Sequence, residues 1–296
     1  MLKIGQYQNL KVNPQFFIKP DHLNHPIVSG NKLRKLKYNL IEAEKANKTV
    51  ILTFGGAYSN HISAVASAGK LLGFKTIGVI RGEELVSKVD GNPTLRYAQQ
   101  CGMTLCFVTR EQYRCKTNND FILELKKQYG DFYLIPEGGT NMLAIKGCEE
   151  ILTSTDKDYD YICCSVGTGG TISGIINSAF PHQKILGFPA LKGDFLKEEI
   201  SKFAKHSNWE LITDYHFGGY GKLNSTLITF INEFKRANDI QLDPIYTGKM
   251  IFGISDLLKK DYFPKHSKIL AIHTGGLQGI AGINQRLEQQ GKPLIV

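Results

Sequence analysis

The sequence predicts an α/β protein with mostly parallel sheets flanked by helices. Short apolar runs rich in β-branched and aromatic residues alternate with longer amphipathic or small-residue stretches, which is the pattern of repeated βα units. Several of these runs end in a glycine pair. Of the 296 residues, 42% are hydrophobic. This excludes disordered and fibrous proteins and is sufficient for one large domain or two closely packed ones.

The predicted elements follow one another along the chain. Apolar runs predict strands over residues 49–54, 75–80, 104–108, 132–135, 159–166, 184–188 and 268–273. The stretches between them predict helices over residues 59–72, 93–101, 119–129, 143–152 and 171–180. The polar segment 191–208 predicts a helical excursion over the surface.

Glycine pairs follow the predicted strands at positions 55–56, 138–139, 169–170 and 275–276, and a fifth pair lies at 218–219. Any single pair is equally well explained as a tight turn. Glycine permits close backbone approach, and ligands bind beyond the carboxyl ends of parallel strands. Five pairs in one chain therefore predict a shared cleft.

The charge is concentrated near the amino terminus. The formal net charge is +9, and residues 1–50 hold nine Lys or Arg against three acids, 9 − 3 = +6.

The first residues lack the apolar core of a signal peptide, and no apolar run approaches the roughly 18 residues of a membrane span. We therefore expect a cytoplasmic protein without a membrane partner. The six cysteines form no C-x-x-C pair and have no histidines at zinc spacing, so we expect reduced, mostly buried thiols and no metal site.

A basic helix is predicted over residues 29–41, with apolar residues at helical spacing and Ser29 or Asn31 as its cap. Its first two turns carry the cations Lys32, Arg34, Lys35 and Lys37. Cations at a helix start oppose the macrodipole by about 0.3–1 kcal/mol each. An anionic ligand would compensate for this arrangement, and the alternative is a solvated basic face.

A lysine in such a positive field has a lowered pKa, and its neutral amine condenses with aldehydes. Nucleic-acid binding is the weakest interpretation because basic and aromatic residues do not interleave in a recognisable motif.

A second motif follows the strand predicted to end at residue 166. Its residues are Gly167, Thr168, Gly169, Gly170 and Thr171, and a helix is predicted to follow them. Amides at a helix start, flanked by hydroxyls, suit a phosphate. A dinucleotide fingerprint needs glycine where Ile172 stands, and neither a P-loop nor a G-x-S-x-G elbow is present. The loop therefore predicts a site for a single phosphate monoester.

A reactive lysine, a phosphate loop and the turn Gly55-Gly56-Ala57-Tyr58-Ser59-Asn60-His61 point together to pyridoxal phosphate. The sequence resembles the 1-aminocyclopropane-1-carboxylate deaminase/D-cysteine desulfhydrase family, within the tryptophan-synthase-β-like (type II) fold of pyridoxal-phosphate enzymes. The resemblance runs from Lys19-Pro20-Asp21 to His273-Thr274-Gly275-Gly276. It implies a two-domain fold, with a smaller domain (48–145) inserted into a larger one (1–47 and 146–296), and a homodimer.

The resemblance also implies roles for individual residues. Lys32 would bond covalently to the cofactor's aldehyde, and Lys35 would hold the phosphate together with residues 167–171. Asn60 would bind the phenolic oxygen, and Ser59 and His61 would border the substrate carboxylate. Tyr220 and Tyr246 match the family's two active-site tyrosines. In isolation, Ser59 could equally be a helix cap, His61 a satisfied histidine, and the tyrosines partly buried core residues.

One departure bears on the reaction. Ring-opening members of the family have glutamate directly after the second tyrosine, where this chain has Thr247. The resemblance therefore implies that Thr247 is among the residues that bind the cofactor. Thr274 lies where desulfhydrase-like members offer a hydroxyl to the cofactor's pyridine nitrogen. A hydroxyl stabilises a protonated nitrogen less than a carboxylate does, which favours a reaction with a good leaving group.

We therefore expect a lyase that performs α,β-elimination on D-cysteine or a related small D-amino acid, with Lys32 as the base and Ser59 as its alternative. Deamination of 1-aminocyclopropane-1-carboxylate, β-replacement, and non-catalytic binding of a phosphate ligand are the competing functions. The basic residues without a role, including Arg34 and Lys37, are expected to be solvated.

Overall fold

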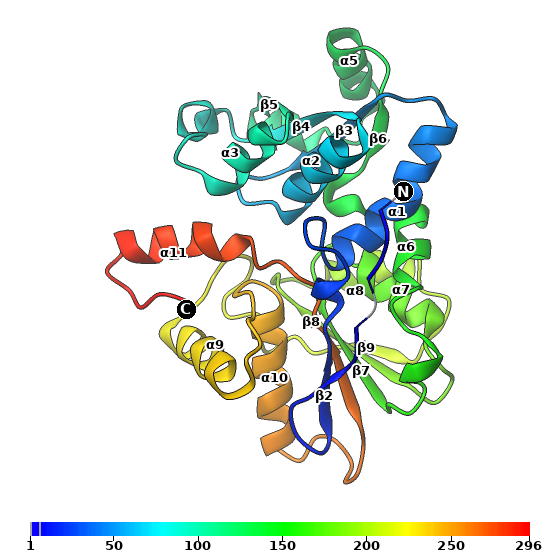
Figure 1. The fold of residues 1–296 in the computed structure, drawn as a ribbon, viewed down its shortest axis with the longest axis vertical. Helices are drawn as coiled ribbons and strands as arrows, with labels where there is room; N and C mark the ends of the chain where they lie inside the picture. The colour runs from blue at the N-terminus through cyan, green and yellow to red at the C-terminus, as the bar shows by residue number, and fades with distance from the viewer. Residues whose placement is uncertain (1, 6) are drawn as a thin grey trace.

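The computed structural model describes residues 2–5 and 7–296, and these residues form two sheets with helices around them (Figure 1). Within this part of the chain, one sheet has six strands in the order β1-β2-β10-β7-β8-β9, and the other has four in the order β5-β4-β3-β6. All pairs are parallel except β1 with β2. The predicted class, α/β with mostly parallel sheets flanked by helices, is confirmed.

The strands of the larger sheet are β1 (Leu10–Lys11), β2 (Phe16–Lys19), β7 (Tyr161–Val166), β8 (Lys184–Pro189), β9 (Trp209–Leu211) and β10 (Ile269–Ile272). Those of the smaller sheet are β3 (Val50–Gly55), β4 (Lys75–Arg81), β5 (Thr104–Val108) and β6 (Tyr133–Ile135). The α-helices are α1 (Asn31–Lys45), α2 (Asn60–Leu72), α3 (Pro93–Gln100), α4 (Arg110–Arg114), α5 (Asn119–Tyr129), α6 (Met142–Cys148), α7 (Gly170–Ser178), α8 (Phe195–Ser201), α9 (Ser225–Asn238), α10 (Thr247–Lys259) and α11 (Gly279–Gln289).

The seven predicted strands are all present, each within two residues of its predicted ends. The structure adds β1, β2 and β9, whose sequences are too short or too polar to be distinguished by pattern. In the polar segment 191–208 only α8 is α-helical, so the predicted excursion is right for less than half of its length. All strands of the smaller sheet lie within residues 50–135, whereas the domain boundaries at 48 and 145 remain a prediction.

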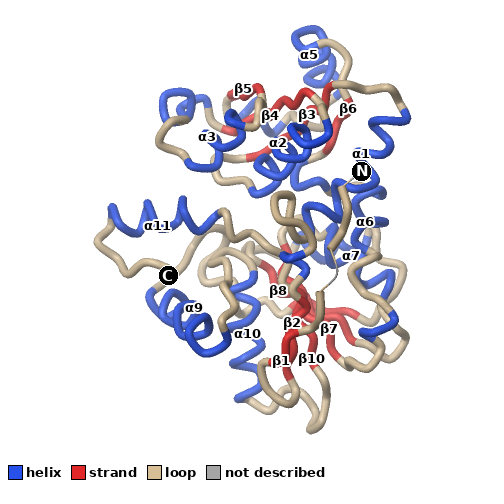
Figure 2. Tube along the Cα trace, viewed as in Figure 1, coloured by secondary structure: helices blue, strands red, loops and turns tan. Residues whose placement is uncertain are grey.

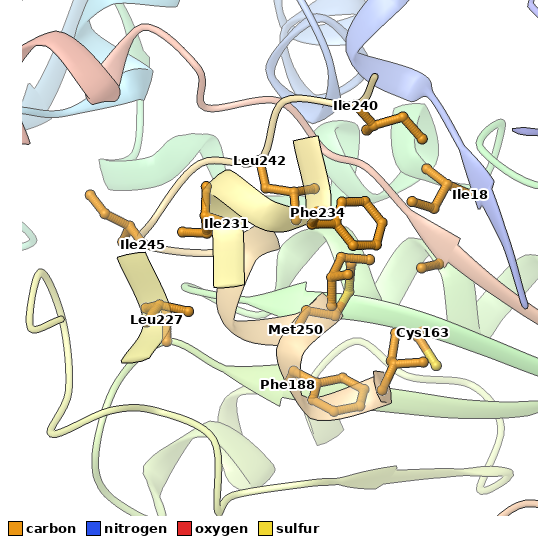
Figure 3. Close-up of a cluster of buried hydrophobic side chains, with 14 of the residues drawn as sticks. Ile18, Cys163, Phe188, Leu227, Ile231, Phe234, Ile240, Leu242, Ile245 and Met250 are labelled. Carbon is orange, nitrogen blue, oxygen red and sulfur yellow. The ribbon is translucent and has the colours of Figure 1, made fainter. Parts of the chain in front are cut away.

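Helices cover both faces of each sheet because alternate strand residues point to opposite sides. In β7, Cys163 belongs to a buried cluster with α9 and α10, whereas Ile162 and Cys164 belong to a cluster with α7. The first of these clusters is shown in Figure 3. The smaller sheet is covered by α2 and α3 on one face and by α4 and α5 on the other. Figure 2 shows the helices surrounding the strands of both sheets.

The basic residues of α1 are only partly solvated, which corrects the prediction for Arg34 and Lys37. Arg34 is 5% exposed, and its guanidinium donates to Asp21 Oδ1 from Nη2 at 2.7 Å and from Nε at 3.1 Å. Lys37 pairs with Glu150 at 2.7 Å. The sequence pattern could not show these partners because both lie outside the helix. Among the described residues, a helix with both the length and the hydrophobicity of a membrane span is absent.

Candidate active site

A cavity of about 470 Å³ is lined by residues from the carboxyl ends of strands in both sheets and from the helix starts beside them. Four of the five glycine pairs contribute to its wall, through Gly56, Gly138, Gly169, and both Gly275 and Gly276. The predicted shared cleft is therefore confirmed for those pairs. The predicted site residues that line the cavity are Lys32, Lys35, Ser59, Asn60, His61, Gly167, Thr168, Gly169, Thr171, Tyr220, Tyr246 and Thr274.

The turn before α1 brings Lys32 to the cavity. Gly30 precedes the helix with a φ of +64°, and a Cβ at this position would lie 2.1 Å from the carbonyl oxygen of Thr274. Only glycine fits such a close approach. The side chain of Asn24 accepts from the amide of Gly30 at 2.9 Å and donates to its carbonyl at 3.1 Å. Gly30 is thus the residue that caps the helix, and neither Ser29 nor Asn31 provides a side-chain cap.

Lys32 has the electrostatic environment of a reactive amine. Burial, followed by the positive charge of Lys35, lowers its pKa from 10.5 to about 7. Its Nζ donates to Asn31 Oδ1 at 3.1 Å, and Asn31 Nδ2 donates to Thr171 Oγ1 at 2.9 Å. Asn31 therefore connects the lysine to the glycine/threonine loop. A large fraction of Lys32 is neutral near pH 7, which is the form that attacks aldehydes.

Lys35 and several hydroxyls form a site that suits a phosphate. Its Nζ donates to the carbonyl of Gly138 at 2.9 Å, to Thr140 Oγ1 at 3.0 Å and to Thr168 Oγ1 at 3.3 Å. A Cβ at Gly170 would lie 2.9 Å from Thr140 and 3.2 Å from Lys35 Nζ. Gly170 is not in the cavity wall, but because it has no Cβ it leaves space for the side chains of Thr140 and Lys35.

The same cluster lies at the start of α7, where amides of the first turn have no partners within the helix. An ammonium group, hydroxyls and free amides together are the donor set that a phosphate dianion requires. The residues present therefore fit the phosphate of pyridoxal phosphate.

The start of α2 forms another part of the wall. Ser59 caps this helix, because its Oγ accepts from the amide of Ile62 at 3.3 Å, and it also lines the cavity. Asn60 is the first helical residue, and its Nδ2 would lie 3.1 Å from a Cβ at Gly276. Glycine at position 276 thus keeps the Asn60 amide unobstructed. The amides of Asn60 and His61 belong to the first turn and are free to bind an anion.

The His61 ring is buried and neutral, and its protonated nitrogen, Nε2, is already engaged. Thr53 Oγ1 donates to the carbonyl of Ile135 at 2.8 Å, so it accepts from His61 Nε2, also at 2.8 Å. The Nδ1 atom is buried without a hydrogen-bond partner among the described residues. Burial, with Lys32 and Lys35 nearby, holds the pKa of His61 well below its usual value. The ring offers a carboxylate no donor, and only the backbone N–H of His61 can do so.

Tyr220 and Tyr246 lie together at the cavity although 26 residues separate them in the sequence. Their ring centroids are 6.2 Å apart with an interplanar angle of 64°. Tyr246 directly precedes α10, whereas Tyr220 lies in an irregular loop and is 46% exposed. Burial raises the pKa of both phenols, and the proximity of Tyr220 raises that of Tyr246 further. Both therefore remain protonated near neutral pH and can donate hydrogen bonds.

Thr247 does not contribute to the cavity, which corrects its predicted place. Its side chain is fully buried and donates to Asp243 Oδ2 at 2.6 Å. Thr274 lines the cavity as predicted, and its hydroxyl lies 3.3 Å from that of Ser165 at the end of β7. Of the two threonines, Thr274 is the one whose hydroxyl is available to a bound ligand.

Sequence reasoning missed several residues of the wall. The sequence pattern predicts Asn31 only as a cap and does not single out Ser165, Arg81 or Glu137. It also does not single out Thr140, which lies behind the wall and accepts from Lys35. Ser165 and Arg81 lie at the ends of β7 and β4, so the rule that ligands bind beyond strand ends could have found them. Glu137 Oε1 accepts from the hydroxyl of Tyr113 at 2.7 Å, a contact between distant segments that no local pattern shows.

The cysteines carry no disulfide, and three of the six (Cys148, Cys163 and Cys164) are buried. The described residues contain no group of three or more His, Cys, Asp or Glu that could hold a metal ion.

The fold and the cavity define a type II pyridoxal-phosphate enzyme. The family model described as pyridoxal-phosphate dependent enzyme matches residues 3–275, and the chain belongs to this family. The bifunctional D-cysteine desulfhydrase/1-aminocyclopropane-1-carboxylate deaminase of Arabidopsis thaliana is 30% identical over 297 residues, covering 90% of this chain and 73% of that protein. Family membership favours an enzyme over the alternative of non-catalytic phosphate binding.

Solved structures agree with this assignment. A structure described as an ACC deaminase homologue superimposes with a TM-score of 0.81 at 28% identity, covering 93% of this chain and 88% of the other. A hydrogen sulfide-producing enzyme of Fusobacterium nucleatum superimposes with a TM-score of 0.66 at 18% identity, covering 93% and 97%, and shows the shared fold. The resemblance found in the sequence is thereby confirmed at the level of family and fold.

Proposed function

We propose that the protein catalyses pyridoxal-phosphate-dependent α,β-elimination on D-cysteine or a related small D-amino acid, giving pyruvate, ammonia and sulfide. One observation carries this proposal: among the described residues, no unengaged carboxylate lines the cavity. Glu137 is the carboxylate in the wall, and its oxygens are engaged by Tyr113 at 2.7 Å and by Lys116 at 3.4 Å. The hydroxyls of Thr274 and Ser165 stand in the wall instead.

The absence of such a carboxylate bears on the reaction. The cofactor, when bound, supplies an electron sink for negative charge that develops at the substrate's Cα. A hydroxyl partner stabilises a protonated pyridine nitrogen less than a carboxylate does, so the sink is weaker. Opening an unactivated cyclopropane ring needs a strong sink, whereas a thiolate is a good leaving group. The balance favours elimination of a β-substituent over ring opening.

The residues that would hold the cofactor follow from the geometry above. Lys35, Thr168, Thr171 and the amides at the start of α7 would bind its phosphate, with Gly167, Gly169 and Gly170 leaving the necessary space. Lys32 would carry it covalently. Thr274 would face its pyridine nitrogen, and Asn60 would donate to its phenolic oxygen. Thr247 has no part in this proposal.

The remaining residues would bind substrate and move protons. The free amides of Asn60 and His61 at the start of α2 suit the substrate carboxylate. Lys32 Nζ, with a pKa of about 7, suits the transfer of a proton from Cα near neutral pH. Ser59 is the alternative base, but its Oγ already accepts from Ile62. Tyr220 and Tyr246 would donate hydrogen bonds to the leaving group and limit access of water. The homodimer and the cytoplasmic location remain predictions.

A substrate panel tests this proposal. Purified protein saturated with pyridoxal phosphate is incubated separately with D-cysteine, L-cysteine and 1-aminocyclopropane-1-carboxylate, and sulfide and keto acid are measured. We expect pyruvate and sulfide in equal amounts from D-cysteine and the least product from the cyclopropane. Formation of 2-oxobutyrate from the cyclopropane at a comparable rate would contradict the argument from the missing carboxylate. A β-replacement enzyme would instead consume an added thiol without releasing pyruvate.

A further inference from the structure

A buried lysine outside the cavity wall holds the loop that carries Tyr220. Lys249 lies in the first turn of α10 and is 1% exposed. Its Nζ donates to the carbonyl of His216 at 2.8 Å and to that of Gly219, also at 2.8 Å. No carboxylate oxygen of the described residues lies within ion-pair distance of it. This buried ammonium is thus held mainly by two carbonyls of one loop.

Those two carbonyls belong to consecutive turns. The amide of Gly219 donates to His216 O at 3.0 Å, and the amide of Lys222 donates to Gly219 O at 3.2 Å. A carbonyl oxygen has two lone pairs, so each can accept from its turn and from Lys249 at once. Lys249 therefore bridges the turn before Tyr220 and the turn that contains it.

Before Tyr220 the loop is held by Tyr215, whose hydroxyl donates to Asp256 Oδ2 at 2.7 Å, and by Phe217, whose ring packs edge-on against Phe252. Around Tyr220 itself the backbone is irregular. The loop contains no helix or strand between β9 and α9, and Phe217, Gly218, Gly219 and Gly221 have positive φ values of 53°, 88°, 111° and 65°. Tyr220 itself is 46% exposed, and its ring packs against that of Tyr246 on one side. Arg286 donates to the carbonyl of Gly221 at 2.8 Å from the surface. The buried anchor close to Tyr220 is Lys249.

The same helix start determines the position of the second tyrosine. Tyr246 directly precedes α10, and Lys249 follows it by three residues. We propose that Lys249 is a positioning residue that sets Tyr220 against Tyr246 at the cavity by holding the carbonyls of His216 and Gly219. The proposal rests on the proposed function only in that the tyrosines contact substrate. Burial lowers the pKa of Lys249 to about 8, so it is mostly charged at pH 7, and its hydrogen bonds are of the stronger, charge-assisted kind.

A double-mutant cycle tests the connection to Tyr220. We expect Lys249→Gln to lower kcat/KM for D-cysteine by on the order of 10- to 100-fold in the wild-type background, because small misplacements of an active-site group are costly. In a Tyr220→Phe background the same substitution should change kcat/KM by less than about twofold. An equal loss in both backgrounds would show that Lys249 acts through something other than Tyr220 and would overturn the proposal.

A second measurement does not depend on turnover. Hydrogen exchange of the Gly219 and Lys222 amides in the cofactor-saturated protein should be at least about tenfold faster in Lys249→Gln than in wild type, with core amides of β7 unchanged. Lys259→Gln, an exposed lysine of the same helix, is the matched control and should leave exchange and kcat/KM unaltered. If none of the tested amino acids is turned over, the proposed function is wrong. Hydrogen exchange of the loop amides still tests whether Lys249 holds the loop. Unchanged exchange in the loop would refute the anchor itself, and Lys249→Met repeats the test if the glutamine variant does not fold.

Discussion

Thr247 Oγ1 donates a hydrogen bond of 2.6 Å to Asp243 Oδ2, and the Thr247 amide donates to the same oxygen at 2.8 Å. The other oxygen of this carboxylate accepts from the amides of Ile245 at 2.9 Å and Tyr246 at 2.8 Å. Asp243 therefore satisfies the donors at the start of α10, and Thr247 completes its set of partners. The threonine after Tyr246 is explained by this contact and not by contact with a cofactor.

Replacing Thr247 with Val should destabilise the fold without removing the cofactor site. Asp243 is 1% exposed and would lose its shortest hydrogen bond, and loss of one partner of a buried charged group costs about 1–3 kcal/mol. The free energy of unfolding, measured by urea titration, should fall by this amount, with cofactor absorbance retained. Thr213→Val, at an exposed position, is the control. A variant that is as stable as wild type but no longer binds pyridoxal phosphate would show that Thr247 contacts the cofactor, which would contradict this assignment.

Lys32→Ala should abolish the covalent attachment of the cofactor. Wild-type protein with bound pyridoxal phosphate should absorb at about 410–430 nm. Borohydride treatment should remove that band and leave a label that stays on the protein after denaturation. The variant should show no such band and leave no label. Lys35→Ala, which removes a phosphate partner but not the reactive amine, should form the band only at higher cofactor concentration. A colourless wild-type protein that cannot be reconstituted would disprove the assignment.

The pKa of Lys32 should be visible in the pH dependence of cofactor incorporation. Burial and Lys35 lower this pKa from 10.5 to about 7, and the neutral amine is the reactive form. The reactive fraction therefore rises with pH through about 7 and is nearly complete above pH 8. The rate of band formation on adding pyridoxal phosphate to cofactor-free protein should level off there. A rate that keeps rising toward pH 10 would indicate an ordinary lysine pKa.

Arg34 and Lys37 lie on the same helix and should respond very differently to replacement by methionine. Arg34→Met leaves the fully buried Asp21 without its ionic partner, which typically costs about 3–5 kcal/mol. Lys37→Met breaks a partly exposed pair with Glu150, for which a loss below about 1 kcal/mol is expected. Thermal and urea unfolding of both variants measure the difference. Equal losses would contradict the structural role assigned to Arg34.

The order of the βα units can be predicted from the amino-acid sequence alone, because strand and helix periodicities and glycine pairs are local patterns. Local patterns also located the basic helix start and the loop 167–171, since each occupies one continuous segment. The choice of Lys32 and Lys35 among the cations of that helix start came from family resemblance. Asn60, Tyr220, Tyr246 and Thr274 were placed through family resemblance, and each lines the cavity. Short strand β2, in contrast, is recognisable only by its pairing with β10, which lies 250 residues further along the chain.

Which polar groups face the cavity and which are engaged elsewhere depends on the folded arrangement of the chain. Thr247 is directed to Asp243, the His61 ring to Thr53, and Arg34 to Asp21. Thr274 and Ser165, 109 residues apart, meet because β10 and β7 are neighbours in the sheet. The physical reason is the same in each case. A buried polar side chain must find a partner, and that partner is chosen by what the fold brings within about 3 Å.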